Sequence, residues 1–297
     1  PASRASFPRH PFPRPMRLLV TGHRGQLGTE LMRACAARGI DATGVDVDTV
    51  DVTDRDAVAA AVAAARPDAV IHCAAWTAVD ACESDPDKAF RANATAVAWV
   101  AEACAAARAH LVHVSTDYVF DGTKPSPYVE TDVPNPRSVY GKSKLAGEIE
   151  ALKHPAAAVA RTSWVCGAAG GNMVKTVLRL VREGKPLAFV SDQVGHPTFT
   201  ADLAPALLRL AADRRSGLYH VTNQGAVSWW EFVREIVRLA GGDPATVRPI
   251  TTAELDPPRP APRPANSVLA DVAWRAAGYP PLRDFRAPLA ELIAELG

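Results

Sequence analysis

Tyr140 and Lys144 are the residues of this chain whose types and spacing are best suited to chemistry. They lie four residues apart, after a proline-broken loop and after Ser138, a residue type that favours helix N-caps. On a helix that begins there, both side chains would lie on one face, one turn apart. A fixed ammonium lowers the pKa of a neighbouring phenol, so Tyr140 could exchange a proton with a carbonyl or alcohol oxygen. The pair predicts carbonyl reduction, although chance could place the same two residues on a solvated helix.

A third candidate catalytic group precedes this pair along the chain. Residues 110–114 have the pattern of a buried strand, and the polar run Ser-Thr-Asp follows them, which puts Thr116 at the carboxyl end of the strand. We expect the Thr116 hydroxyl to hydrogen-bond the substrate oxygen that Tyr140 protonates. Alone, such a run is typical of a turn or a helix cap. In combination with Tyr140 and Lys144 it favours a catalytic role.

A glycine-rich turn near the start of the chain predicts a dinucleotide cofactor. Apolar residues 17–21 have the pattern of a buried parallel strand and lead into Gly22, Gly25 and Gly28, before a helix expected over residues 29–38. At this spacing the first glycine allows a tight bend, the second lets a pyrophosphate approach the backbone, and the third lets the helix pack on the strand. We therefore expect a bound cofactor, NADH or NADPH.

Residues that follow the next two predicted strands would complete the cofactor site. Asp46 follows the strand of residues 41–45, where its carboxylate could accept hydrogen bonds from the adenosine ribose and favour NADH. Arg24 in the glycine turn could instead neutralise the 2′-phosphate of NADPH, so the sequence leaves both cofactors open. Ala74 and Ala75 end the following strand, and their small side chains would let the cofactor lie against the backbone.

The composition excludes several other classes of protein. The 297 residues include 33 basic and 32 acidic side chains, a balance that gives no indication of nucleic-acid or membrane binding. No apolar run approaches the roughly 20 residues of a membrane span, and no signal peptide is recognisable, so we expect a cytoplasmic protein. The five cysteines are scattered without metal-ligand spacing, which predicts reduced thiols and no metal site.

The alternation of strands and helices predicts an α/β fold, namely a Rossmann-type doubly wound parallel sheet with a smaller C-terminal substrate-binding lobe. We expect a disordered tail over residues 1–15, an NAD(P)-binding domain over 16–165 and the lobe mainly over 166–297, with residues about 200–222 recruited to the sheet. The other elements expected are helices over 54–66, 86–108, 140–152, 172–182, 202–212, 228–240, 271–277 and 284–296, and strands over 156–165, 187–190 and 217–221.

Longer segments resemble the dTDP-4-dehydrorhamnose reductases, a family within the extended short-chain dehydrogenase/reductase superfamily. The likeness runs from Met16 to the end of the chain. It is specific, because a generic reductase would share the glycines and the Tyr/Lys pair but few of the other segments. The segments that carry it are Gly25-Gln-Leu-Gly28, Ala74-Ala-Trp-Thr-Ala-Val-Asp80, Ser115-Thr-Asp-Tyr-Val-Phe-Asp-Gly122, Val139-Tyr-Gly-Lys-Ser-Lys-Leu-Ala-Gly-Glu148, Arg161-Thr-Ser-Trp-Val165, Asp192-Gln-Val-Gly-His-Pro-Thr198 and Arg263-Pro-Ala-Asn-Ser267.

The resemblance implies reduction of the 4-keto group of dTDP-4-dehydro-L-rhamnose to dTDP-L-rhamnose, a donor for cell-envelope polysaccharide. It implies hydride transfer from the nicotinamide and protonation by Tyr140, while Lys144 binds the nicotinamide ribose. For the cofactor, it further implies pyrophosphate contacts from Gly25, Gln26 and Leu27, a ribose contact from Asp46, adenine contacts from Asp51 and Val52, and nicotinamide contacts from Ala74 and Ala75. For the sugar nucleotide, it implies contacts from Thr116, Asp117 and Trp164. Trp164 could also be ordinary core packing.

Three other functions remain open at this point. A related ketoreductase could act on a different dTDP-4-keto-6-deoxysugar, because the catalytic residues contact the carbonyl and not the sugar's other hydroxyls. A non-catalytic subunit, like that of methionine adenosyltransferase, would not need an acidified phenol. A dehydratase would need a further acid after Asp117, which is absent from the sequence. A homodimer is as compatible with the sequence as a monomer.

Overall fold

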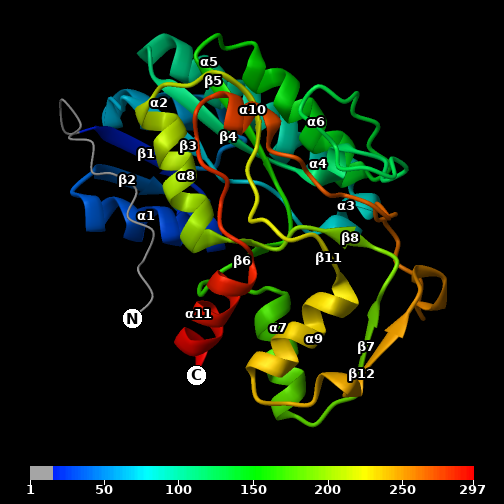
Figure 1. Cartoon of the computed structure of the whole chain (residues 1–297). Coiled ribbons are helices and arrows are strands. Elements are labelled where there is room, and N and C mark those ends of the chain that lie inside the picture. Colours follow the sequence, from blue (N-terminus) through cyan, green and yellow to red (C-terminus); the bar gives the residue numbers. More distant parts are fainter. Residues whose placement is uncertain (1–15) are drawn as a thin grey trace.

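The computed structural model describes residues 16–297, so the predicted tail over residues 1–15 lies outside the described chain. Its centre is a six-stranded, wholly parallel sheet in the order β2-β1-β3-β4-β5-β10 (Figure 1). The order reverses between β1 and β3, which is where doubly wound sheets bind their ligands. The strands are β1 (Arg17–Thr21), β2 (Asp41–Val45), β3 (Ala69–His72), β4 (His110–Thr116), β5 (Ala157–Thr162) and β10 (Gly217–His220).

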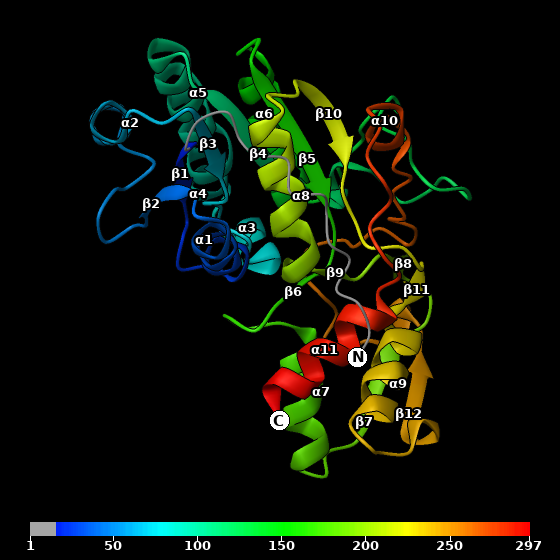
Figure 2. The same ribbon diagram turned by 60° about the vertical axis from the view of Figure 1, so that its left-hand side comes forward.

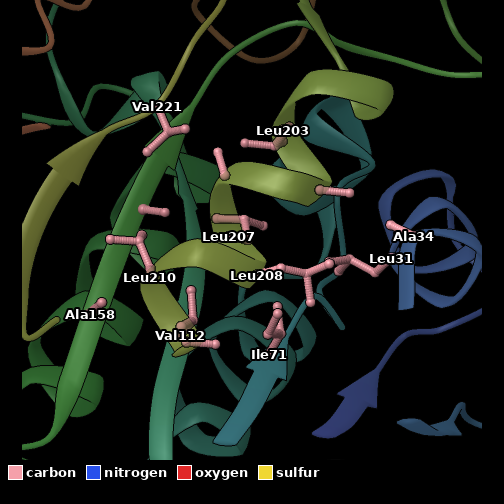
Figure 3. Close-up of a cluster of buried hydrophobic side chains, with 14 of the residues drawn as sticks. Leu31, Ala34, Ile71, Val112, Ala158, Leu203, Leu207, Leu208, Leu210 and Val221 are labelled. Atoms are coloured by element: carbon pink, nitrogen blue, oxygen red, sulfur yellow. The ribbon is translucent and has the colours of Figure 1, made fainter. Parts of the chain in front are cut away.

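The central strands β1, β3, β4 and β5 are buried on both faces, because helices cover both sides of the sheet. In β1, Leu18 and Val20 belong to one core, whereas Leu19 between them belongs to the other. Helices α1 (Gln26–Arg38) and α8 (Thr200–Ala212) cover the first face, and Figure 3 shows the α8 leucines directed at the strands. The second face is covered by α2 (Arg55–Ala65), α5 (Ala96–Ala107) and α6 (Val139–Leu152).

Strand β10 and helix α8 join this sheet from far along the chain, as predicted. Gly217–His220 pairs in parallel with β5, and α8 packs beside α1 over β3 and β4. The short helix α10 (Val272–Ala276) also belongs to this core, because Trp274 is buried in it. The C-terminal third of the chain therefore contributes to both parts of the molecule.

A smaller unit lies below the carboxyl ends of the strands (Figures 1 and 2). It has its own apolar core, in which Phe199, Phe232 and Phe285 are buried. Helix α9 begins with a full capping box between Ser228 and Glu231, as the sequence predicts. The unit is built from α7 (Met173–Arg182), β7 (Leu187–Val190), α9 (Trp229–Leu239), β12 (Val247–Ile250) and α11 (Arg286–Leu296), with β7 and β12 paired in parallel.

Two expected helices differ from the prediction. Helix α1 begins at Gln26 inside the glycine turn, three residues before the expected start, because Gly25 itself serves as its N-cap. The helix expected over residues 86–108 is divided into α4 (Pro86–Phe90), a π-helical turn (Arg91–Thr95) and α5. The remaining elements are α3 (Val79–Ser84), β6 (Val165–Cys166), β8 (Val194–Gly195), β9 (Thr198–Phe199), β11 (Val227–Ser228) and three 3₁₀ turns (Asp117–Val119, Pro244–Thr246, Thr252–Glu254).

The cysteines agree with their predicted state, since all five are free thiols. No group of three or more potential metal ligands gathers within residues 16–297. Over the same residues, no helix is both long and apolar enough to cross a membrane.

Buried histidines make this fold sensitive to acid. Five of them lie in the core, and burial lowers the pKa of each: to about 3 for His72 and His220, to about 4 for His110 and His196, and well below its usual value for His113. The unfolded chain binds protons on these rings once the pH falls below about 6.5, whereas the folded chain does not. The contribution of these histidines to stability is therefore constant above that pH and is lost as the pH falls toward 4.

We expect His110→Leu to reduce this sensitivity. The substitution removes a fully buried ring at the start of β4, remote from Thr116 at the strand's other end. Between pH 6.5 and 5, the free energy of unfolding should fall by about 2 kcal/mol less in the variant than in the wild type. Urea unfolding across this pH range measures the difference. Equal pH dependence in the two proteins would mean that His110 is not held neutral by the fold.

Candidate active site

Helix α6 places Tyr140 and Lys144 at the carboxyl ends of the strands. Ser138 caps the helix as predicted, because its hydroxyl accepts a hydrogen bond of 3.1 Å from the Gly141 amide. A Cβ at Gly141 would lie only 2.2 Å from the Tyr118 carbonyl oxygen, so glycine is needed directly after Tyr140. This close packing buries the Tyr140 ring edge-on against Tyr118, with 5.5 Å between the ring centroids.

Thr116 and Asp117 lie where β4 ends, beside Tyr140. The Thr116 hydroxyl donates to the Asp117 carboxylate over 3.0 Å and accepts from the Tyr118 amide over 3.2 Å. Burial raises the pKa of Asp117 to about 6, although hydrogen bonds from the Ser267 and Thr116 hydroxyls oppose that shift. The structure therefore brings Tyr140 close to the adjacent residues Thr116 and Asp117, which precede it by more than twenty residues in the sequence.

Lys144 is buried on the same face of α6, one turn after Tyr140. Its ammonium donates a hydrogen bond of 2.7 Å to the carbonyl oxygen of Val114 in β4. Burial lowers the pKa of Lys144 to about 8, while the nearby Glu148 carboxylate acts in the opposite direction. The cation is thus fixed between the catalytic helix and the strand that carries Thr116.

The effect expected of Lys144 on the Tyr140 phenol differs from what the structure shows. Burial raises the pKa of Tyr140 well above its usual value, and the Thr116 hydroxyl only partly opposes that shift. The prediction of a lowered pKa was therefore wrong for this arrangement. The physical reason is that the Lys144 ammonium is directed at the Val114 carbonyl, while the low polarity around the phenol disfavours the phenolate.

The glycine turn fits a pyrophosphate through its bare backbone. Gly22 has a φ of +68°, and a Cβ there would lie 2.8 Å from the Ala74 nitrogen. A Cβ at Gly28 would lie 2.1 Å from the Gly22 carbonyl oxygen, so glycine is needed at both ends of the turn. No side chain within the described residues caps α1, and the first amides of the helix, at Gln26 and Leu27, remain available to an anion.

Asp46 braces this turn. Its carboxylate accepts hydrogen bonds of 2.9 Å from the amides of Arg24 and Val47. Burial alone would raise the pKa of Asp46, but these two amides together with the charges of His23 and Arg24 outweigh it, so the pKa lies below its usual value. Arg24 forms an ion pair of 2.5 Å with Asp48. The predicted contact between Asp46 and a ribose stays a prediction.

The other predicted cofactor residues lie around the same edge of the sheet. Asp51 accepts hydrogen bonds from the Thr53 amide and hydroxyl, and Val52 packs against the second core. Ala74 follows β3 and lies directly against the glycine turn, with Ala75 next to it in the chain. Their contacts with adenine and nicotinamide remain predictions.

Trp164 lies between the sheet and the smaller unit. Its backbone adopts a left-handed conformation with a φ of +43°, which is uncommon for a residue other than glycine. Its ring stacks on Trp229 at the start of α9, with 3.6 Å between the ring centroids. A Cβ at Gly195 would lie 2.8 Å from the same ring. Trp164 is thus packed, as its alternative interpretation predicts, and its contact with a sugar stays a prediction.

The comparisons with known proteins identify the family. Residues 16–297 match the family model described as the RmlD substrate binding domain. The chain belongs to this family. A dTDP-4-dehydrorhamnose reductase from Streptomyces griseus is 45% identical over 293 residues, which is 96% of this chain and 95% of the relative. A second reductase of that name, from Mycobacterium tuberculosis strain H37Rv, is 43% identical over 94% of this chain and 92% of its own.

A solved structure of the same family supports the fold. The dTDP-4-dehydrorhamnose reductase of Bacillus anthracis, in complex with NADP, has a TM-score of 0.91 and 36% identity, and the match covers 95% of this chain and all of that chain. The resemblance derived from the sequence motifs and the Rossmann-type fold are both confirmed. The described chain holds the bare glycine turn that a dinucleotide requires.

Sequence reasoning left the role of Asn93 undecided between an ordinary polar position and a brace. Asn93 lies on the π-helical turn and is fully buried. Its side-chain amide pairs with both backbone groups of Trp76, at 2.8 and 3.0 Å, and donates to the Ser143 hydroxyl over 3.0 Å. Asn93 on this π-turn therefore ties the loop after β3 to the catalytic helix.

Sequence reasoning also missed two ion pairs around the site. Glu148, one turn after Lys144, accepts two hydrogen bonds from Arg161 and one from the Ser115 hydroxyl. The ion pair between Glu148 and Arg161 is almost fully buried. Arg263 binds Asp80 in bidentate fashion, which fastens the proline-rich loop to the loop after β3. The only signal in the sequence was that these residues fall within the family's motifs.

We expect Asn93→Ala to destabilise the protein by about 3 kcal/mol, because it leaves buried backbone groups of Trp76 without partners. Asn135→Ala is the matched control, since Asn135 donates one exposed hydrogen bond to Asp121 and should cost less than about 1 kcal/mol. Urea unfolding at neutral pH measures both changes. Equal losses in the two variants would contradict a bracing role for Asn93.

We expect Asp117→Asn to show an opposite pH dependence to the buried histidines. Because the folded pKa of Asp117 is raised, the folded wild type keeps a proton that the unfolded chain has lost between about pH 4 and 6, and stability declines as the pH rises through this window. From pH 5 to 7.5 the free energy of unfolding of the variant, measured by urea unfolding, should therefore rise by about 1 kcal/mol relative to that of the wild type.

Asp121→Asn is the control for this measurement. Hydrogen bonds, first of all from the Thr123 amide, hold the pKa of Asp121 far below its usual value, so Asp121 is ionised in both states throughout that pH range. Its stability difference from the wild type should not change with pH. A constant difference for Asp117→Asn as well would show that Asp117 is ionised in the folded protein.

Proposed function

We propose that this protein is an NAD(P)H-dependent reductase that converts the 4-keto group of dTDP-4-dehydro-L-rhamnose to the hydroxyl of dTDP-L-rhamnose. The observation that carries the proposal is the gathering of Thr116, Tyr140 and Lys144 at the strand ends, next to a bare glycine turn, in a member of this family. A reduced nicotinamide, when bound, would supply the hydride. We propose a cytoplasmic location, with a dTDP-4-keto-6-deoxysugar as the substrate.

Each catalytic group has a distinct task in this proposal. The Tyr140 phenol, kept protonated by burial, donates its proton to the oxygen at C4 as negative charge develops there. The Thr116 hydroxyl, oriented by Asp117, donates a hydrogen bond to the same oxygen. The Lys144 ammonium, fixed by the Val114 carbonyl, would bind the nicotinamide ribose.

Burial keeps the Tyr140 phenol protonated in the resting site, which proton donation requires. It is a weaker acid than a free tyrosine, so it transfers its proton only as a strongly basic oxygen forms at C4. The direction of reduction therefore agrees with a site in which Tyr140 starts protonated.

A second candidate is a ketoreductase for another dTDP-4-keto-6-deoxysugar. It is favoured by a relative from Streptomyces antibioticus that is 43% identical over 95% of this chain and is named as a probable dTDP-4,6-dihydroxy-2-methyloxan-3-one 4-ketoreductase. The catalytic groups would be unchanged. The two candidates differ in the sugar that is bound. Trp164 and Asp117 are the side chains proposed to contact that sugar.

We expect Tyr140→Phe to lower kcat about 100-fold or more with dTDP-4-dehydrorhamnose generated in situ, because the variant loses the proton donor. Loss of nicotinamide absorbance, followed separately with NADH and NADPH, measures the rate and the cofactor preference. Tyr219→Phe is the matched control, since the Tyr219 hydroxyl binds the Ser216 carbonyl at the far end of β10 and should not affect the rate.

The other outcomes distinguish the candidates. Turnover by the wild type only with other dTDP-4-keto-6-deoxysugars would favour the second candidate. Binding of NADPH without turnover of any such sugar would favour a non-catalytic subunit. Full activity in Tyr140→Phe would exclude Tyr140 as the proton donor while leaving the reductase activity in place.

A further inference from the structure

A cavity lies at the amino ends of the strands, on the opposite edge of the sheet from the proposed active site. Its volume is about 410 Å³, which is within the range of small-molecule sites. It opens where β1 and β3 begin and where α2 and α5 end. The apolar side chains that line it are Ala59, Val62, Ala63, Pro67, Ala103, Ala106 and Ala107, and four arginines and one aspartate complete the wall.

Of the four arginines, only Arg17 lies within ion-pair distance of a carboxylate among the described residues. Arg17 lies 4.0 Å from the Asp68 carboxylate, and Arg214 donates hydrogen bonds to the carbonyl oxygens of Asp68 and Arg108. The guanidinium groups of Arg66 and Arg108 make no hydrogen bond or ion pair with any of the described residues. The cavity therefore presents two exposed cations beside an apolar floor.

Three of these arginines also have strained backbones. Arg66, Arg108 and Arg214 have φ values of 43°, 55° and 48°, in the left-handed region where glycine or asparagine is usual. Within the described chain only Trp164, in the proposed active site, shares this conformation among residues other than glycine. Strained residues of this kind cluster at functional sites.

Helices α2 and α5 have no basic residue in their last turn, so Arg66 and Arg108 also complement the negative ends of these helices. Helix α1 shows the relaxed solution, with Arg38 in its last turn bound to the Ala34 carbonyl and Gly39 in the left-handed capping position. Helices α2 and α5 instead carry Arg66 and Arg108 at the capping position itself, which directs both cations to the same cavity.

We propose that this cavity binds a small amphipathic anion, namely an apolar or planar body that carries a carboxylate, sulfonate or phosphate group. The alanine-lined floor would bury the body, and Arg66 and Arg108 would form charge-assisted hydrogen bonds with the anionic group. The site does not share a residue with the proposed active site, so it stands or falls independently of the proposed function.

The test uses 1-anilinonaphthalene-8-sulfonate, whose fluorescence rises in apolar sites, with the full chain saturated by NADPH so that the cofactor site is filled. We expect saturable binding to the wild type and about tenfold weaker binding to R66G/R108G. Glycine is the relaxed residue at both positions, so this variant should fold at least as well as the wild type. The variant R33A/R238A, which removes the same charge outside the cavity, should bind as the wild type does.

Competition by simple naphthalenes identifies the anionic group. Naphthalene-1-carboxylate and 1-naphthyl phosphate should displace the dye, and the more effective one shows which group the site prefers, whereas uncharged 1-naphthol should displace it poorly. Wild-type affinity should also fall at high ionic strength. The proposal would be overturned by complete loss of the signal on adding NADPH, by equal binding to R66G/R108G, or by displacement by 1-naphthol as effective as that by the anions.

Discussion

The proposed active site depends on how closely helix α6 approaches the chain around it. A Cβ at Gly141 would lie 2.2 Å from the Tyr118 carbonyl, and one at Gly147 would lie 2.1 Å from the Asn93 carbonyl. These two contacts fix the helix by its backbone, and therefore fix Tyr140 and Lys144 with respect to β4. Asn93 completes the arrangement, because its amide joins the same helix to the loop after β3.

This packing places several charged groups where water is excluded, and the charges must be stabilised inside the protein. Lys144 is fixed by the Val114 carbonyl, and Glu148 is paired with Arg161 and the Ser115 hydroxyl. Burial shifts the pKa values of Lys144 and Asp117 toward their neutral forms, to about 8 and about 6. Low polarity disfavours charge in the resting site but strengthens each interaction that forms as charge develops on the substrate oxygen.

The parallel sheet gives the molecule two chemically different edges. At the carboxyl ends, the glycine turn, Thr116 and α6 meet at the reversal of strand order, where this topology usually holds its ligand. At the amino ends, the helices return to the sheet, and their capping residues Arg66 and Arg108 meet at a cavity. Strained residues occur at both edges, at Trp164 and at the arginines, whereas the sheet between them is regular.

The sequence by itself determined the sheet, the glycine turn and the Tyr140/Lys144 pair, because these follow from local patterns: apolar runs, glycine spacing and a helix cap. It also identified the family, because the motifs are contiguous. Only the tertiary structure decided the π-helical turn at Asn93, the raised pKa of Tyr140, the stacking of Trp164 on Trp229 and the cavity at the amino ends. Each of these depends on contacts between segments far apart in the chain or on burial, and neither leaves a periodic signal in the order of residues.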